Sequence, residues 1–245
     1  MRNLPIITKS ILLVNLLMWL ADLIASRYGF PLYTLLGLHY ITAADFHWWQ
    51  PLTYMFMHGG FSHLFFNMFA VLMFSPVLEN EWGPRRLLIY YIICGLGAAF
   101  VQEAVWALKV QHLLATYTAE SVMMNYANQV VTIGASGAVF GILLAFGWLF
   151  PDVPMFLLFI PIPIRARIFV IIYAAVELFA GFSNLPGDNI AHFAHLGGML
   201  FGLILLLLWR WEKNWHFPRF WEKWHKVDSA KEKDYSDYHY HRKIE

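Results

Sequence analysis

Long apolar stretches separated by short polar segments dominate the chain. They cover residues 11–26, 61–78, 87–108, 130–150, 168–182 and 190–209. A bilayer core takes about 20 apolar residues of helix, with a range of about 17–25, so most of these stretches can span it and the fifth is short. Residues 155–164 are also apolar, but this segment is too short to span and contains Pro161 and Pro163, which predicts a loop at the membrane surface. The pattern therefore predicts an all-α polytopic membrane protein, a bundle of six transmembrane helices.

Composition supports a membrane protein and narrows the possible ligands. Charged residues make up 13% of the chain, against about 25% in a soluble domain, and hydrophobic residues make up 59%. The net charge of +1 gives no basic field for nucleic acid, which we do not expect as a partner. Cys94 is the single cysteine, so the sequence offers no intrachain disulfide and no cysteine cluster for a metal.

The distribution of positive charge predicts the orientation. If loops alternate across the membrane, those on one side hold 15 Lys and Arg residues, nine of them from Arg210 onward, and those on the other hold only Arg27 and Lys109. Because positive loops stay inside, both termini are predicted to be cytoplasmic. We expect a multi-pass protein of the cell (inner, cytoplasmic) membrane. The first apolar stretch is long for a signal peptide, and no small-residue cleavage pattern follows it.

Polar residues inside the predicted spans gather near one end. His63, Asn67, Ser136, His192 and His195 all lie near the N-terminal ends of even-numbered spans. Even-numbered spans run from outside to inside in the predicted topology, so these groups come to the outer leaflet. Polar residues are costly in lipid, which makes them functional candidates.

Small residues predict which helices pack closely. They recur every four positions in the fourth and sixth spans, at Gly137, Gly141 and Ala145 and at Ala194, Gly198 and Gly202. Such stripes allow two membrane helices to approach, which could bring the Ser136 hydroxyl within reach of the His195 imidazole.

The segment VTIGASGAVFG, residues 131–141, places a serine near a helix start. Thr132 is a candidate N-cap, which puts Ser136 in the first turn, where backbone N–H groups lack intrahelical acceptors. Such N–H groups can stabilise an oxyanion, and Gly134 and Gly137 leave room for a substrate backbone. Together with His63 and Asn67, these are the parts of an acyl-transfer site.

Four motifs then resemble the rhomboid family of intramembrane serine proteases, in its compact six-helix prokaryotic form. They are HGGFSHLFFN with His58, His63 and Asn67, GASG with Ser136, AHLGGMLFG with His195, Gly198 and Gly202, and ENEWGPRR with Glu79, Gly83 and Arg86. The segment WWQPLTYMFMHGG also resembles the family's first loop. The resemblance covers roughly residues 10–210, the length of the six-span core.

The resemblance implies a role for each matched residue. Ser136 would be the nucleophile and His195 the general base, as a dyad without a third acid, and Asn67 and His63 would contribute to the oxyanion hole. Supporting positions are His58, Gly134, Phe140, Gly198 and Gly202, and the residues of a structural turn are Glu79, Gly83 and Arg86. The implied substrates are single-span or multi-span membrane proteins in the lipid bilayer, cleaved near the outer leaflet, with no metal and no cofactor.

Two positions differ from the family's usual residues. Gln50 stands where an arginine often follows the tryptophan, so a charge that anchors the first loop is missing. Phe140 stands where many members have tyrosine; it keeps a ring that can pack against His195 but loses the hydroxyl. Neither position performs the chemistry, so we expect these changes to tune the activity and not to abolish it.

Other interpretations stay open at this point. A lone membrane serine is often a packing residue bonded to its own backbone, and His63 with Asn67 could be a structural pair between helices. Glu79 with Arg86 is interpreted as a helix cap and ion pair, and Glu177 has no assigned partner, so packing is its default role. A transporter fits poorly because no repeat is visible and the polar groups do not lie at the midplane. The alternative function is a catalytically weak rhomboid-like protein that binds membrane clients.

The chain is predicted to divide near residue 210. Residues 1–210 would form the six-helix protease domain. Residues 211–245 mix Trp with Lys and Arg and then become polar, which predicts a cytoplasmic tail that is first interfacial and then disordered.

Overall fold

A computed structural model describes residues 4–116, 126–157, 160–183 and 191–210. The chain divides into two compact units, Met1–Leu207 and Leu208–Glu245, and the arrangements below concern the first. The predicted tail, residues 211–245, lies outside the described residues, and the division at residue 210 stays a prediction.

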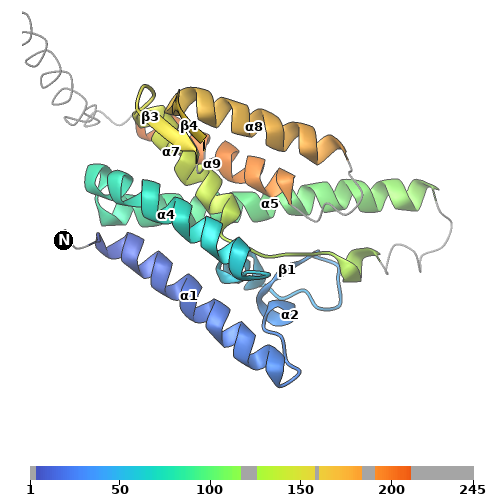
Figure 1. The fold of residues 1–245 in the computed structure, drawn as a ribbon. Helices are drawn as coiled ribbons and strands as arrows, with labels where there is room; N and C mark the ends of the chain where they lie inside the picture. Colours follow the sequence, from blue (N-terminus) through green and yellow to red (C-terminus); the bar gives the residue numbers. More distant parts are fainter. Residues whose placement is uncertain (1–3, 117–125, 158–159, 184–190, 211–245) are drawn as a thin grey trace, which may run out of the picture. The chain divides into compact units, whose positions relative to one another are not determined.

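Five described helices are long and apolar enough to cross a membrane. They are α1 (Ile6–Arg27), α4 (Phe61–Trp82), α5 (Pro84–Thr116), α8 (Ala166–Ser183) and α9 (His192–Arg210). The fourth predicted span corresponds to α7 (Ser136–Leu149), a shorter apolar helix of 14 residues that rises only about 21 Å. The prediction of an all-α polytopic membrane protein is confirmed, and each predicted span corresponds to one helix (Figure 1).

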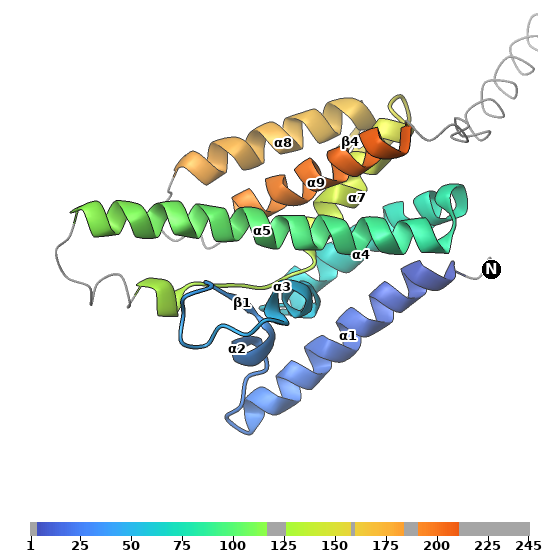
Figure 2. The ribbon, with the colours of Figure 1, turned by 180° about the vertical axis from the view of Figure 1, so that it is seen from behind.

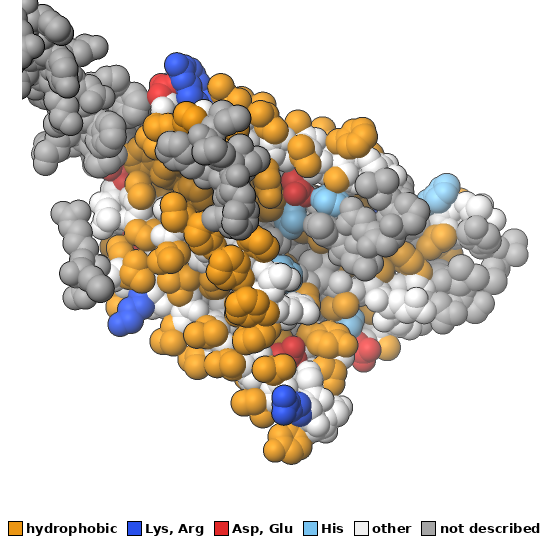
Figure 3. Space-filling model, in the orientation of Figure 1, with side chains coloured by type: hydrophobic (Ala, Val, Ile, Leu, Met, Phe, Trp, Pro, Cys, Tyr) orange, Lys and Arg blue, Asp and Glu red, His pale blue; other side chains and the backbone are white. Residues whose placement is uncertain are grey.

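Helix α7 is the centre of this bundle. Eleven of its fourteen residues are buried, and it contacts α4, α5 and α8. In contrast, few residues of α1 and α8 are buried, and their exposed side chains are mostly large hydrophobic ones such as Leu17 and Phe179. Figures 1 and 2 show α7 between its neighbours, and Figure 3 shows hydrophobic side chains over most of the described face. The apolar outer surface is what lipid contact requires.

The segment that precedes α7 differs from the prediction. Residues 130–135 are not helical: β2 (Val131–Thr132) pairs antiparallel with β1 (Leu38–His39), and Leu38 faces Thr132 in the register. The N-cap of α7 is Ala135, so the expectation that Thr132 caps the helix is wrong. Backbone pairing with the first loop holds this segment extended, and the helix therefore begins at Ser136 itself.

Two further connections among the described residues contain short elements. The first loop holds α2 (Tyr33–Leu36), α3 (Gln50–Thr53) and the 3-10 helix η1 (Tyr54–Phe56). The segment predicted as a surface loop forms an antiparallel hairpin, β3 (Pro154–Leu157) and β4 (Ile160–Arg165). A two-stranded hairpin has a free edge on each strand, which tolerates the prolines of β4.

Glu79 joins two helices at the opposite end of α4 from His63. Its carboxylate accepts hydrogen bonds from the backbone N–H groups of Ile7 and Thr8, both at 2.8 Å, and from the Thr8 hydroxyl. Because the first N–H groups of a helix lack intrahelical acceptors, Glu79 caps α1 from a neighbouring helix. Gly83, with φ of +80°, then separates α4 from α5.

Glycines on α9 allow close contact with α7 and α5. A Cβ placed on Gly198 would overlap the carbonyl oxygen of Gly137 and lie 2.6 Å from its carbonyl carbon. One on Gly202 would overlap the Tyr90 hydroxyl and lie 3.1 Å from Cys94 Sγ. The predicted close approach of the fourth and sixth spans is therefore observed.

Gly198→Ala is expected to lower the melting temperature in detergent. The clash is with backbone of α7, which cannot rotate away, and overpacking of this kind typically costs about 1–3 kcal/mol. The measurement is thermal unfolding of the purified variant. Gly60→Ala is the matched control, because a Cβ there meets nothing within 4 Å. Equal melting temperatures for the two variants would contradict the close α7–α9 contact.

Candidate active site

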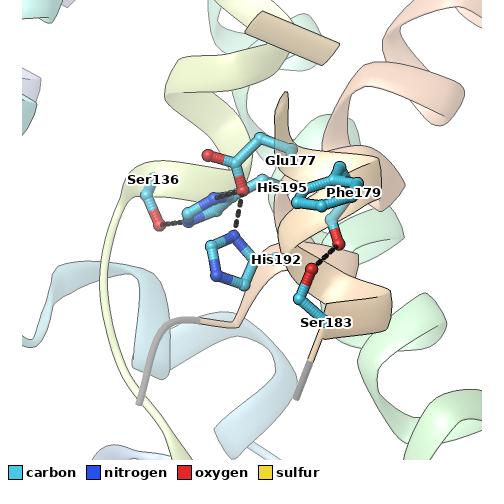
Figure 4. A network of polar contacts seen from close by, with 6 residues as sticks. All are labelled: Ser136, Glu177, Phe179, Ser183, His192 and His195. Atoms are coloured by element: carbon cyan, nitrogen blue, oxygen red, sulfur yellow. Dashed lines mark hydrogen bonds and ion pairs between the residues drawn. The ribbon is translucent and has the colours of Figure 1, made fainter. Parts of the chain in front are cut away.

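Ser136 and His195 lie together where α7 and α9 begin. Ser136 is the first residue of α7, and its Oγ lies 2.7 Å from His195 Nε2, on the first turn of α9 (Figure 4). The contact between Gly198 and Gly137 lies next to this pair, because Gly137 follows Ser136 directly and Gly198 lies about one turn after His195. Tight backbone packing therefore sets the distance between a hydroxyl and an imidazole nitrogen.

A carboxylate on α8 completes a chain of polar contacts. Glu177 Oε2 lies 2.8 Å from His195 Nδ1 and 2.7 Å from His192 Nδ1. Glu177 therefore has two hydrogen-bond partners, which corrects the expectation that it has none and only packs. The sequence did offer one indication, because an ionisable residue inside a span needs a partner, but its partners lie on another helix.

Aromatic rings fix the His195 imidazole from one side. The Phe140 ring stacks on it with centroids 4.3 Å apart and planes 9° from parallel, and the Tyr173 ring lies 5.2 Å from Phe140. His195 is only 8% exposed. Phe140 thus provides the packing that we expected of it, and loses only a hydroxyl relative to tyrosine.

The other wall of the site comes from the start of α4. His63 Nδ1 accepts the N–H of Gly59 at 3.4 Å, which leaves the proton of a neutral ring on Nε2. That Nε2 points to Gly134: a Cβ there would lie 2.7 Å from His63 Nε2 and 3.6 Å from Ser136 Oγ. Any side chain at position 134 would therefore project between the imidazole and the hydroxyl and collide with His63.

Asn67 and His58 lie behind His63. Asn67 is buried and its Nδ2 donates to the His63 carbonyl oxygen at 3.0 Å, so one amide hydrogen is used within α4. The His58 ring packs edge-on against His63, with centroids 5.0 Å apart. Burial, together with the nearby His63, lowers the pKa of His58 to about 3, so His58 is neutral at physiological pH.

The segment before Ser136 is anchored at two points. Gly134 donates its N–H to the Tyr54 carbonyl at 2.9 Å and has φ of +130°, a conformation that disfavours other residues. The β1–β2 pairing holds the preceding residues. The first loop is thus connected by backbone bonds to the peptide that carries the hydroxyl.

Gln50 stabilises that first loop without a charge. Its buried amide donates to the carbonyls of Asp45, at 2.7 Å, and Leu35, and its Oε1 accepts the His39 N–H at 3.3 Å. A neutral side chain with both donors and acceptors can satisfy several backbone groups at once. The departure from arginine thus leaves the loop anchored.

Within the described part of the chain, Glu177, His192 and His195 are also the one set of side chains with metal-ligand spacing. The two nitrogens lie 2.7 and 2.8 Å from the same carboxylate oxygen, which is hydrogen-bond separation. A zinc ion bound at about 2.0–2.2 Å would need its ligands further apart. The arrangement fits a hydrogen-bonded carboxylate better than a metal site.

Comparison with known proteins identifies the family. The model of the Rhomboid domain matches residues 45–212, more than half of the chain. RHOMBOID-like protein 5 of Arabidopsis thaliana is 30% identical over 161 residues, which are 65% of this chain and 44% of that protein. YdcA of Bacillus subtilis (strain 168) is 28% identical over 67% of this chain and 69% of its own length.

A third relative extends further along the chain. Rhomboid-like protein 11, chloroplastic, of Arabidopsis thaliana is 28% identical over 207 residues, 81% of this chain and 63% of that protein. The matched part thus spans less than two thirds of both Arabidopsis proteins. With a family model that covers most of the helical core, the conclusion is that this chain is a multi-pass membrane protein that belongs to the rhomboid family.

Proposed function

We propose that this protein is an intramembrane serine endopeptidase that cleaves transmembrane segments of other membrane proteins. The observation that carries the proposal is the 2.7 Å contact between Ser136 Oγ and His195 Nε2 on two tightly packed helices. The name of YdcA contains the words rhomboid protease, which supports the same class of activity. Family members act on membrane proteins within the bilayer, and we extend this to single-span and multi-span substrates here.

Ser136 would act as the nucleophile. His195 Nε2 accepts the hydroxyl proton as Oγ bonds to the carbonyl carbon of the scissile peptide, which gives a tetrahedral intermediate. The protonated Nε2 then donates to the leaving amine nitrogen as the C–N bond breaks. Water hydrolyses the resulting acyl ester through the same histidine, which regenerates the Ser136 hydroxyl.

The oxyanion would occupy the space beside Gly134. His63 Nε2–H faces this space, and the N–H of Ser136 is at a helix N-terminus, where it has no intrahelical acceptor. The second amide hydrogen of Asn67 is a further candidate donor. These groups would stabilise negative charge that develops only in the transition state, which is what accelerates the chemical step.

The site would open to the outer leaflet of the cell membrane. His63, Ser136 and His195 all lie in the first turn of their helices, and the positive-inside charge distribution supports an outer position for those ends. We propose accordingly that both termini are cytoplasmic. A substrate helix would be cut near its outer end, where water for hydrolysis is available.

Reconstitution tests this function. Purified protein in liposomes is mixed with a model single-span substrate, and cleavage is followed by gel and by mass of the fragments. A fluorophosphonate probe is expected to label the protein at Ser136 and to depend on His195. A protein that binds the substrate helix but neither cleaves it nor reacts with the probe would instead be a client-binding relative.

Gly134→Ala is expected to lower kcat by about 10²–10³, which is the usual loss when one donor can no longer bond the oxyanion. The new Cβ would fill the space next to His63 Nε2. Gly29→Ala is the matched control, because Gly29 also has positive φ, +79°, but no atom within 4 Å of the added carbon. Both changes strain the backbone, and only the first should affect kcat. Wild-type kcat for Gly134→Ala would contradict the assigned oxyanion position.

A further inference from the structure

Two histidines share one carboxylate oxygen at the edge of the site. Glu177 Oε2 is 2.8 Å from His195 Nδ1 and 2.7 Å from His192 Nδ1, and Glu177 is 8% exposed (Figure 4). The residues come from α8 and α9, so the contact also links these helices. Along the described length of α8, three residues are buried: Ala166, Val170 and Glu177.

With Glu177 ionised, the hydrogen-bonding pattern constrains where the protons of the two histidines lie. An ionised carboxylate has only acceptor sites, so both Nδ1 atoms must carry hydrogen. A neutral His195 then has its lone pair on Nε2, and this nitrogen faces the Ser136 hydroxyl at 2.7 Å. The opposite tautomer would place an Nδ1 lone pair against the carboxylate and would leave Nε2 unable to accept the proton of Ser136.

We infer that Glu177 is a positioning residue that holds His195 in the tautomer and orientation required of a general base, with His192 fixing the carboxylate from its second side. The inference rests on the proposed function of Ser136 and His195 and adds an acid to that pair. Glu177 touches neither Ser136 nor the site of the oxyanion, so its effect passes through His195. The carboxylate also faces the positive charge that forms on the imidazole during proton transfer, which favours the transition state.

Glu177→Gln is the main test, with kcat and KM measured on the reconstituted protein. It keeps the shape of the side chain and removes the charge. We expect kcat to fall by about 10² or more, since the corresponding change in a serine protease triad costs about 10⁴. KM and melting temperature should stay near wild-type values. Glu103→Gln is the matched control, because Glu103 is a carboxylate of α5 that accepts the Ile41 N–H, away from the site.

NMR of the histidines in the wild-type protein gives an independent test, because it measures the tautomer of His195. A purely structural role of Glu177 would not require a particular tautomer. With ¹⁵N-labelled imidazoles, His195 and His192 should both show the Nδ1–H tautomer. A His195 with hydrogen on Nε2 in the resting protein would overturn the inference. This measurement needs no variant to fold.

The remaining outcomes separate three explanations. If Glu177→Gln keeps more than a third of wild-type kcat, or loses activity only in proportion to a loss of folded protein, Glu177 is a structural link and the inference is wrong. If EDTA abolishes activity and Zn²⁺ restores it, the cluster is a metal site and the inference is also wrong. Failure of the proposed function is distinct, because wild type would then show no cleavage that depends on Ser136.

Discussion

Ser136→Ala is expected to abolish cleavage of a membrane substrate while the protein stays folded. Loss of the nucleophile in serine proteases lowers kcat by roughly 10⁶. The change removes one oxygen from the first residue of α7, and alanine favours a helix at least as well as serine. Cleavage is measured in liposomes against vesicles without enzyme, and folding is measured by thermal unfolding.

Ser183→Ala provides the matched control for this result. The Ser183 hydroxyl donates to the Phe179 carbonyl of its own helix at 2.7 Å, which is the usual structural role of a serine in a membrane helix (Figure 4). We expect full cleavage from this variant, and probe labelling should disappear only with Ser136→Ala. Turnover by Ser136→Ala above the background would refute the serine-protease proposal.

The sequence predicts the helices well because lipid imposes a strong constraint on them. Every backbone polar group in a span must be bonded internally, so apolar runs long enough to cross the membrane form helices with few exceptions. The stripes with Gly137 and Gly198 further predict which helices approach, since close packing between membrane helices depends on small residues. The local sequence pattern is therefore enough to predict the helices of the bundle and the close contact between α7 and α9.

The parts that the sequence did not predict depend on contacts between distant segments. β2 forms because the first loop supplies β1 as a partner some 90 residues away, and this pairing delays the start of α7 to Ser136. Residues near Thr132 are compatible with either structure, and nothing local decides between them.

Glu177 illustrates the same limit at the site. A carboxylate in a span indicates that some partner exists, but whether α8 turns it toward α9 is a question of tertiary packing. Its two partners, His192 and His195, are themselves polar candidates in the sequence. Glu177 meets His192 and His195 only because α8 packs against the start of α9.

His195→Ala is expected to be inactive and His192→Ala to keep at least about a tenth of wild-type activity. Helical geometry at about 100° per residue places His195 close to the direction of Gly202, on the glycine stripe of α9, and His192 toward the edge of that face. His195 accordingly contacts Ser136 through Nε2 and Glu177 through Nδ1. Its loss removes the general base, and among the residues that the structure describes no other side chain bonds to both the hydroxyl and the carboxylate.

His192→Ala removes one of the two donors that reach Glu177 Oε2, and His195 still holds the carboxylate. A hydrogen bond to a charged group contributes about 1.5–3 kcal/mol, but only the part that acts on His195 in the transition state appears in kcat. We therefore expect a loss of several-fold, with KM unchanged and Ser136 still labelled by the fluorophosphonate at a reduced rate. Both variants remove an imidazole from the first turn of one helix, so they serve as controls for each other. If His192→Ala were inactive and His195→Ala active, the general base would be His192 and not His195. Glu177 would then position His192.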